Sequence, residues 1–238
     1  MFPFSEEISL KPDLKVPYQE VLKWIWPLLT PERQAKIEKV LEGRTFNNVV
    51  VLEGIYDRGN ASAVMRSAEA FGFAQVHMIE LGDKFKESQR TTAGADKWVE
   101  LQKLKSTREC VAELKRQGKQ IVVTHLDSGS RPISEIDFSI PTALVLGNEK
   151  QGASQEIIEA ADHRVIVPMG GFVQSFNISV AGALCFYQMY LSRQAKLGRQ
   201  GDLSALEKEI LKAVYATRTL DSSADILEQK MSKEMQKS

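Results

Sequence analysis

The chain contains 238 residues, of which 43% are hydrophobic and 26% are charged. This composition is typical of a folded globular protein and excludes a largely disordered chain. Its 31 lysines and arginines are balanced by 31 aspartates and glutamates, so the formal net charge is zero. Net charge therefore gives no reason to expect a nucleic-acid or membrane partner, and any RNA must bind a local patch.

Metal, disulfide and membrane chemistry are not expected from the residue types. Cys110 and Cys185 stand outside any paired motif, which favours buried thiols. The histidines have no short spacing to a cysteine, so we expect no metal site. No apolar run reaches the roughly 18 residues that span a bilayer, and acidic residues stand where a targeting peptide has basic ones. We expect a cytoplasmic protein, or an organelle protein if an upstream targeting segment exists.

In chain order, residues 1–43 are expected to form an N-terminal helical extension, with a charged helix that begins after Thr30 and ends near Gly43. Apolar, β-branched runs then alternate with helical patterns, which predicts an α/β fold whose parallel sheet carries helices on both faces. The expected strands are 48–53, 75–79, 120–124, 142–146 and 164–167, and the expected helices are 62–71, 107–117, 154–161 and 176–196. Residues 201–238 are expected to form a C-terminal helical tail, either solvated or partner-binding.

Ligands of parallel sheets bind beyond the carboxyl ends of the strands, so the loops that follow strands are of interest. In the first, Asn60 is placed to cap the next helix, and the apolar stripe of that helix should leave Arg66 on the opposite side. The stripe consists of Ala61, Val64, Met65, Ala68 and Gly72. Two interpretations stay open: a plain cap with a solvated arginine, or a polar pair that suits a phosphate.

The second loop runs from Gly147 to Ser154. Gly147, Gly152 and Ser154 fit the frame of a phosphate-cradling loop, but Ala153 stands where that loop needs a lysine to reach the β- and γ-phosphates. This substitution speaks against a nucleotide hydrolase. The turn can still offer backbone groups to a ligand such as adenine.

The third loop breaks at Pro168, passes two glycines and enters a helix through Ser175 and Asn177. These two polar residues are explained either by a helix cap and a local hydrogen bond or by contacts with a ligand. No histidine lies nearby to activate Ser175, which excludes the usual serine-hydrolase arrangement.

In this order and at this spacing, the three loops resemble the signature motifs of the SpoU or TrmH family of SPOUT-class RNA 2′-O-methyltransferases. The matching residues are Asn60, Arg66, Ser67 and Ala68 in the first motif, Leu144, Leu146, Gly147, Glu149 and Gly152 in the second, and Val167, Pro168, Met169, Ser175, Asn177 and Ser179 in the third. Phe176 replaces the usual leucine, a change of little consequence if this position packs on adenine.

The resemblance covers about residues 33 to 200 and is greatest to the TrmH branch, which methylates a D-loop guanosine of tRNA. Features of that branch are Arg44, the segment 92–98, Thr124 and Arg193. The resemblance implies that residues 44–200 form a SPOUT methyltransferase domain with a C-terminal trefoil knot. It also implies S-adenosylmethionine as cofactor, tRNA in preference to rRNA as substrate, and a homodimer that completes each active site.

The resemblance further implies the roles of individual residues. The catalytic residues would be Arg66, Asn60, Glu149, Ser175 and Asn177, and the cofactor would be held by Thr124, Leu146, Gly147, Val167, Met169 and Phe176. RNA would contact Arg44, Arg193, Lys196 and Arg199, together with Arg33, Lys36 and Lys39. The family often assigns Arg66 as general base, but an arginine with a pKa above about 12 keeps its proton at neutral pH. We therefore expect Arg66 to bind the phosphate beside the target ribose.

The helix after Asn177 is the expected dimer surface. Its small residues allow a second helix to approach closely, and its later residues offer more apolar surface than one sheet face needs. The small residues are Ser179, Ala181, Gly182 and Ala183, and the apolar ones are Phe186, Tyr187, Met189, Tyr190 and Leu191. An rRNA methyltransferase of the same family and an RNA-binding relative without catalysis remain as alternatives, although the intact motifs speak against the second.

Overall fold

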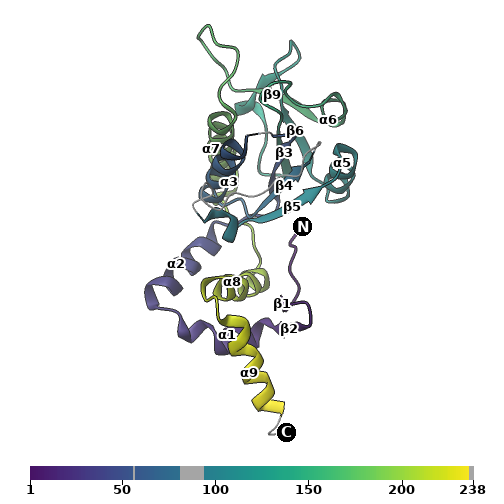
Figure 1. Cartoon of the computed structure of the whole chain (residues 1–238). Helices are drawn as coiled ribbons and strands as arrows, with labels where there is room; N and C mark the ends of the chain where they lie inside the picture. Colours follow the sequence, from purple (N-terminus) through teal and green to yellow (C-terminus); the bar gives the residue numbers. More distant parts are fainter. Residues whose placement is uncertain (56, 81–93, 236–238) are drawn as a thin grey trace. The chain divides into compact units, whose positions relative to one another are not determined.

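The computed structural model describes residues 1–55, 57–80 and 94–235 (Figure 1). The chain forms two compact units, one made of Met1–Arg44 with Gly201–Ser238 and the other of Thr45–Gln200. Both ends of the chain therefore contribute to one unit, whereas the sequence suggests a separate extension and tail. None of the described helices is long and apolar enough to cross a membrane.

Within Thr45–Gln200, the described residues form a seven-stranded sheet in the order β5-β4-β3-β8-β6-β9-β7, and each neighbouring pair is parallel. The strands are β3 (Asn48–Glu53), β4 (Gln75–Ile79), β5 (Glu100–Leu104), β6 (Gln120–Thr124), β7 (Arg131–Pro132), β8 (Thr142–Leu146) and β9 (His163–Ile166). Every residue of β3 and β8 is buried, as in a strand covered on both faces. The predicted α/β fold with a parallel sheet is confirmed, and the knot stays a prediction.

Helices cover both faces of this sheet (Figure 1). On one face lie α3 (Arg58–Ala70) and α7 (Ile178–Leu197), and on the other lie α5 (Thr107–Arg116) and α6 (Gln155–Ala160). Alternate residues of the central strands supply the two apolar layers, since successive side chains of a strand point to opposite faces. The short 3-10 helices η2 (Ala95–Lys97) and η3 (Ile133–Glu135) complete the unit.

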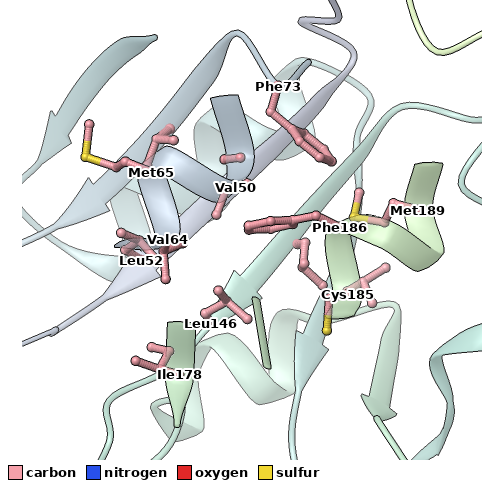
Figure 2. Close-up of a cluster of buried hydrophobic side chains, with 14 of the residues drawn as sticks. Val50, Leu52, Val64, Met65, Phe73, Leu146, Ile178, Cys185, Phe186 and Met189 are labelled. Carbon is pink, nitrogen blue, oxygen red and sulfur yellow. The ribbon is translucent and has the colours of Figure 1, made fainter. Parts of the chain in front are cut away.

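The apolar layer beneath α3 and α7 is shown in Figure 2. Val50 and Leu52 of β3 pack with Val64 and Met65 of α3 and with side chains of α7, all of them buried. The rings of Phe73 and Phe186 lie side by side, with centroids 5.2 Å apart. The predicted stripe of α3 is confirmed at Ala61, Val64, Met65 and Ala68, which are buried while Arg66 is exposed. Truncating a large aromatic side chain in such a core costs roughly 3–5 kcal/mol.

The terminal unit contains an antiparallel hairpin and helices. Its elements are β1 (Glu7–Lys11), β2 (Leu14–Pro17), α1 (Tyr18–Trp24), η1 (Trp26–Leu28), α2 (Pro31–Glu42), α8 (Ala205–Thr219) and α9 (Ser223–Met235). A capping box between Ser204 and Glu207 starts α8. Six residues of α8 are buried, among them Leu211 and Tyr215. α8 is therefore part of a packed core and not of a solvated tail, and the partner-binding alternative stays a prediction.

His77 is a buried polar residue of β4, on the sheet face that α5 covers. Its side chain is inaccessible to solvent, and neither ring nitrogen has a hydrogen-bond partner within the part of the chain that the structure describes. Loss of hydration lowers the pKa of His77 from 6.5 to about 4; the charge of Lys119 adds to this shift, and that of Glu113 opposes it. The fold therefore holds this imidazole in its neutral form.

We expect the free energy of unfolding to fall as the pH drops from 6.5 to about 4. In this window the unfolded chain binds a proton at His77 and the folded chain does not, so acid favours unfolding by up to about 3 kcal/mol. Urea unfolding from neutral pH to about pH 4.5 would measure it, and His77→Leu should flatten the curve. An unchanged pH dependence in His77→Leu would contradict the prediction.

Candidate active site

Three strand ends meet at one edge of the sheet. β8, β6 and β9 are consecutive neighbours, so their carboxyl ends lie together. Leu146 ends β8, Thr124 ends β6 and Val167 follows β9. The hydroxyl of Thr124 donates to the backbone oxygen of Val145 at 3.2 Å, which ties two of these ends to each other. Three of the residues predicted to hold the cofactor are thus brought together from distant parts of the chain.

The loop from Gly147 to Ser154 follows β8 and closes on itself. The backbone groups of Asn148 and Gly152 exchange two hydrogen bonds, both 2.9 Å long. A Cβ at Gly147 would collide with the backbone of Gly152 and Ala153, so this position requires glycine. The Asn148 side chain donates to the backbone oxygen of Gly54 at 2.7 Å. The loop is therefore compact and fastened to the chain that leaves β3.

One residue from each motif enters a hydrogen-bonded network. The side-chain nitrogen Nδ2 of Asn60 donates to Oε1 of Glu149 at 3.0 Å, and Nδ2 of Asn177 donates to Oδ1 of Asn60 at 3.2 Å. Asn177 also caps α7, because its Oδ1 accepts from the backbone N–H of Ser179 at 2.9 Å. The network links the first turn of α3, the loop after β8 and the start of α7.

The cap of α3 differs from the one expected. Asp57 is the N-cap residue, and its carboxylate accepts from the backbone N–H groups of Gly59 at 2.6 Å and Asn60 at 3.1 Å. Asn60 lies inside the first turn, so the prediction that it caps the helix is wrong. Because Asp57 does the capping, the amide of Asn60 is left to bind the other two loops.

The remaining predicted catalytic and cofactor residues lie outside this network. Arg66 and Ser175 are exposed, and neither side chain makes a hydrogen bond or ion pair within the described part of the chain. Met169 is half-buried and Phe176 is 38% exposed. The loop before α7 thus offers apolar surface next to the strand ends, and Arg66 offers an unpaired charge.

Two arginines predicted to bind RNA are buried. Arg44 and Arg193 are each 1% exposed. Arg193 donates to the backbone oxygen of Gln200 at 2.9 and 3.1 Å and to that of Phe138 at 3.3 Å. The guanidinium of Arg44 lies over the ring of Tyr215, 5.8 Å from its centroid. Burial leaves neither group a surface for a phosphate, which contradicts the expected RNA contact and gives both residues a structural role.

The other predicted RNA contacts are at the surface. Lys196 pairs with Asp137 at 2.6 Å, and this hydrogen bond is the main reason that the pKa of Asp137 falls to about 2. Arg199 is exposed, as are Arg33, Lys36 and Lys39 of α2. Of the segment 92–98, residues 92 and 93 lie outside the described residues, and Trp98 is half-buried. No group of three or more potential metal-ligating side chains occurs among the described residues.

Glu53 is a site residue that the sequence analysis missed. Its carboxyl group is 2% exposed and accepts hydrogen bonds from the hydroxyls of Thr107 and Ser154, both at 2.6 Å, and from the backbone N–H of Ser154 at 2.8 Å. The sequence feature that could have identified Glu53 is its place as an acidic residue at the end of the mostly apolar strand β3.

Comparison with known proteins decides the family. Residues 47–187 match the model of the SpoU rRNA Methylase family. The chain belongs to this family. It is 37% identical to the tRNA (guanosine(18)-2′-O)-methyltransferase of Escherichia coli K12, over 70% of this chain and 72% of the relative. The protein of the same name from Borreliella burgdorferi is 38% identical, over 82% of this chain and 91% of the relative.

Solved structures of family members share the fold. The Aquifex aeolicus TrmH/SpoU tRNA modifying enzyme superimposes with a TM-score of 0.73 at 33% identity, covering 79% of this chain and 97% of the other. The SpoU methyltransferase AviRb of Streptomyces viridochromogenes, in complex with AdoMet, gives a TM-score of 0.57 at 24% identity and covers 65% of this chain and 62% of the other. The second likeness concerns the fold alone.

We expect Asn60 and Glu149 to be energetically coupled. A double-mutant cycle with Asn60→Ala and Glu149→Ala, measured by urea unfolding, should give a coupling free energy of about 1 kcal/mol, since one hydrogen bond to a carboxylate joins them. Glu135→Ala is the matched control, because this exposed glutamate belongs to η3 rather than to the network. The control cycle, with Asn60→Ala and Glu135→Ala, should give a coupling free energy of zero. The same value for Asn60 and Glu149 would contradict the prediction.

Proposed function

We propose that this protein transfers a methyl group from S-adenosylmethionine to the ribose 2′-oxygen of a guanosine in tRNA. The observation that carries the proposal is the meeting of the three motif loops, in which Asn60, Glu149 and Asn177 are joined by hydrogen bonds. The names of relatives at 37% and 38% identity favour tRNA over rRNA, although the family model is named for rRNA. We further propose a cytoplasmic location, or an organelle if an upstream targeting segment exists.

The surface at the carboxyl ends of β6, β8 and β9 fits S-adenosylmethionine chemically. The closed loop at Gly147 lies beside the ends of β6 and β8, and its paired backbone oxygens each keep a second lone pair that can accept from the amino group of adenine. Met169 and Phe176 offer half-exposed apolar surface on which a purine can pack. When bound, the cofactor supplies an electrophilic methyl group on a sulfonium. Transfer to a hydroxyl then depends on alignment and on removal of one proton.

The side chains of the network serve that alignment. Asn60, held between Glu149 and Asn177, fixes the start of α3 against the other two loops. Arg66 projects to solvent from the same helix, where its fixed positive charge can bind the phosphate next to the target ribose. An arginine keeps its proton at neutral pH, so the hydroxyl proton passes to that phosphate or to solvent. Ser175, exposed on the loop before α7, would help to shape the catalytic pocket.

The basic side chains that are exposed to solvent are the candidates for RNA binding. With Arg44 and Arg193 buried, the basic side chains left at the surface include Arg199 and, on α2, Arg33, Lys36 and Lys39. Lys196 is partly neutralised by Asp137. We propose that the exposed cations of each unit, Arg66 among them, bind phosphates of the tRNA.

A homodimer is proposed from the outer face of α7. Val180, Leu184, Tyr187 and Leu191 are between 39% and 51% exposed, and their spacing places them on one stripe of the helix. Phe186 and Met189, expected at this interface, are fully buried in the protein's own core, and Gly182 packs against Leu146. A second copy would cover the stripe, since apolar surface of this kind typifies stable interfaces.

Incorporation of labelled methyl groups tests the function. Purified protein with labelled S-adenosylmethionine should modify unmodified tRNA transcripts at a guanosine ribose, and Arg66→Ala should reduce turnover by at least about a hundredfold, because an electrostatic contact of the reacting centre is lost. Cofactor affinity and thermal stability should stay near wild type, since Arg66 is exposed.

Arg108→Ala is the matched control for this assay, because Arg108 is an arginine 90% exposed on α5, on the opposite face of the sheet. Labelling of rRNA alone would refute the tRNA substrate, and labelling of neither RNA would refute the reaction. Loss of stability in Arg66→Ala would give Arg66 a structural role instead.

We expect Leu184→Glu to yield monomers with little methyl transfer, because a charge in the stripe would have to be buried in the interface. Ile140→Glu is the matched control, since Ile140 is a 46% exposed aliphatic residue of the same unit outside α7. Sedimentation equilibrium and the methylation assay decide the outcome. A fully active monomeric wild type would contradict the proposal.

A further inference from the structure

Glu53 stands where one strand and two helices meet. It is the last residue of β3, and its Oε1 accepts the hydroxyls of Thr107, in the first turn of α5, and of Ser154, the N-cap of α6. Its Oε2 accepts the backbone N–H of Ser154 at 2.8 Å. A carboxyl group that is 2% exposed is costly to bury, and these three donors offset the cost.

Ser154 is also the last residue of the loop that begins at Gly147. The other end of this loop is bound to Gly54, the residue that follows Glu53. The Asn148 side chain donates to the backbone oxygen of Gly54 at 2.7 Å. The dipeptide Glu53-Gly54 therefore fastens the loop at both ends. In the sheet, Leu52 pairs with Leu146, so the residues that follow them, Glu53 and Gly147, lie at the same level.

We propose that Glu53 is the positioning residue of the cofactor loop: it sets the conformation of Gly147–Ser154 through Ser154, and with it the affinity for S-adenosylmethionine. This inference rests on the proposed function. Glu53 acts through the loop and is not itself a catalytic residue. Its bond to Thr107 serves a different purpose, which is to anchor α5.

The two hydroxyl donors provide a matched pair of variants. Ser154→Ala and Thr107→Val each remove one hydroxyl that donates to the same oxygen at the same 2.6 Å distance, with little change of shape. Only the first touches the loop. Because Ser154 also caps α6, Ser106→Ala supplies a third variant, which removes the cap of α5 and leaves Glu53 intact.

Titration calorimetry with S-adenosylmethionine should show affinity weakened about tenfold in Ser154→Ala and less than about twofold in Thr107→Val and Ser106→Ala, since a hydrogen bond to a charged group contributes on the order of 1.4 kcal/mol. All three variants should lose similar thermal stability. In cofactor-free protein, the amide proton of Gly152 should exchange faster in Ser154→Ala alone, because its bond to Asn148 depends on the loop.

Glu53→Gln tests the same idea at the acceptor. A glutamine can accept the Ser154 N–H through its carbonyl while its NH₂ donates to both hydroxyls, so we expect affinity within about threefold of wild type. Equal affinities in Ser154→Ala and Thr107→Val, or unchanged Gly152 exchange in Ser154→Ala, would overturn the inference. A wild-type protein that binds no S-adenosylmethionine would instead overturn the proposed function.

Discussion

The pairing of β3 with β8 is the constraint on which the site depends. In this register Leu52 lies beside Leu146, so the chain leaves both strands at one level of the sheet. The first exit leads into α3 with Asn60, and the second leads into the loop with Glu149. Hydrogen bonds between these exits become possible only because the parallel strands end together. A shift of one residue would exchange the two buried faces of β3 between the apolar layers and would displace its exit relative to that of β8.

Apolar packing and hydrogen bonds position different parts of the site. The layer of Figure 2 holds α3 and α7 against the sheet. The loop from Gly147 to Ser154 is instead held by directed hydrogen bonds, among them those of Glu53 and Asn148. A hydrogen bond has a preferred direction and distance, whereas apolar contact is non-directional. Precise placement of a cofactor and a ribose therefore calls for the second kind of interaction.

The sequence predicts the parts of this fold that have strong periodicity. Apolar runs identified β3, β4, β6 and β8 with their observed bounds, because a strand buried on both faces has few polar residues. The sequence does not predict the hairpin of β1 and β2 or the strand β5, since each of these strands mixes polar with apolar residues and is partly exposed. The sequence predicts Arg44 and Arg193 at the surface, because it does not show which carbonyl groups or rings a guanidinium will meet. The cap was assigned to Asn60 instead of Asp57 for a related reason: both residue types cap helices, and only the backbone shows which one precedes the first turn.

The buried arginines bear on how a protein without net charge can bind RNA. Arg193 gives its guanidinium to backbone carbonyl groups, so two of the expected RNA contacts are replaced by structural ones. Among the cations that remain at the surface, Arg66 has no acidic partner within the described residues. An unpaired cation binds a phosphate without first giving up an ion pair, while Lys196 must be released from Asp137. If Arg66 has the role we propose, binding of the phosphate beside the reacting ribose, it should therefore contribute more to RNA affinity than its share of the positive charge suggests.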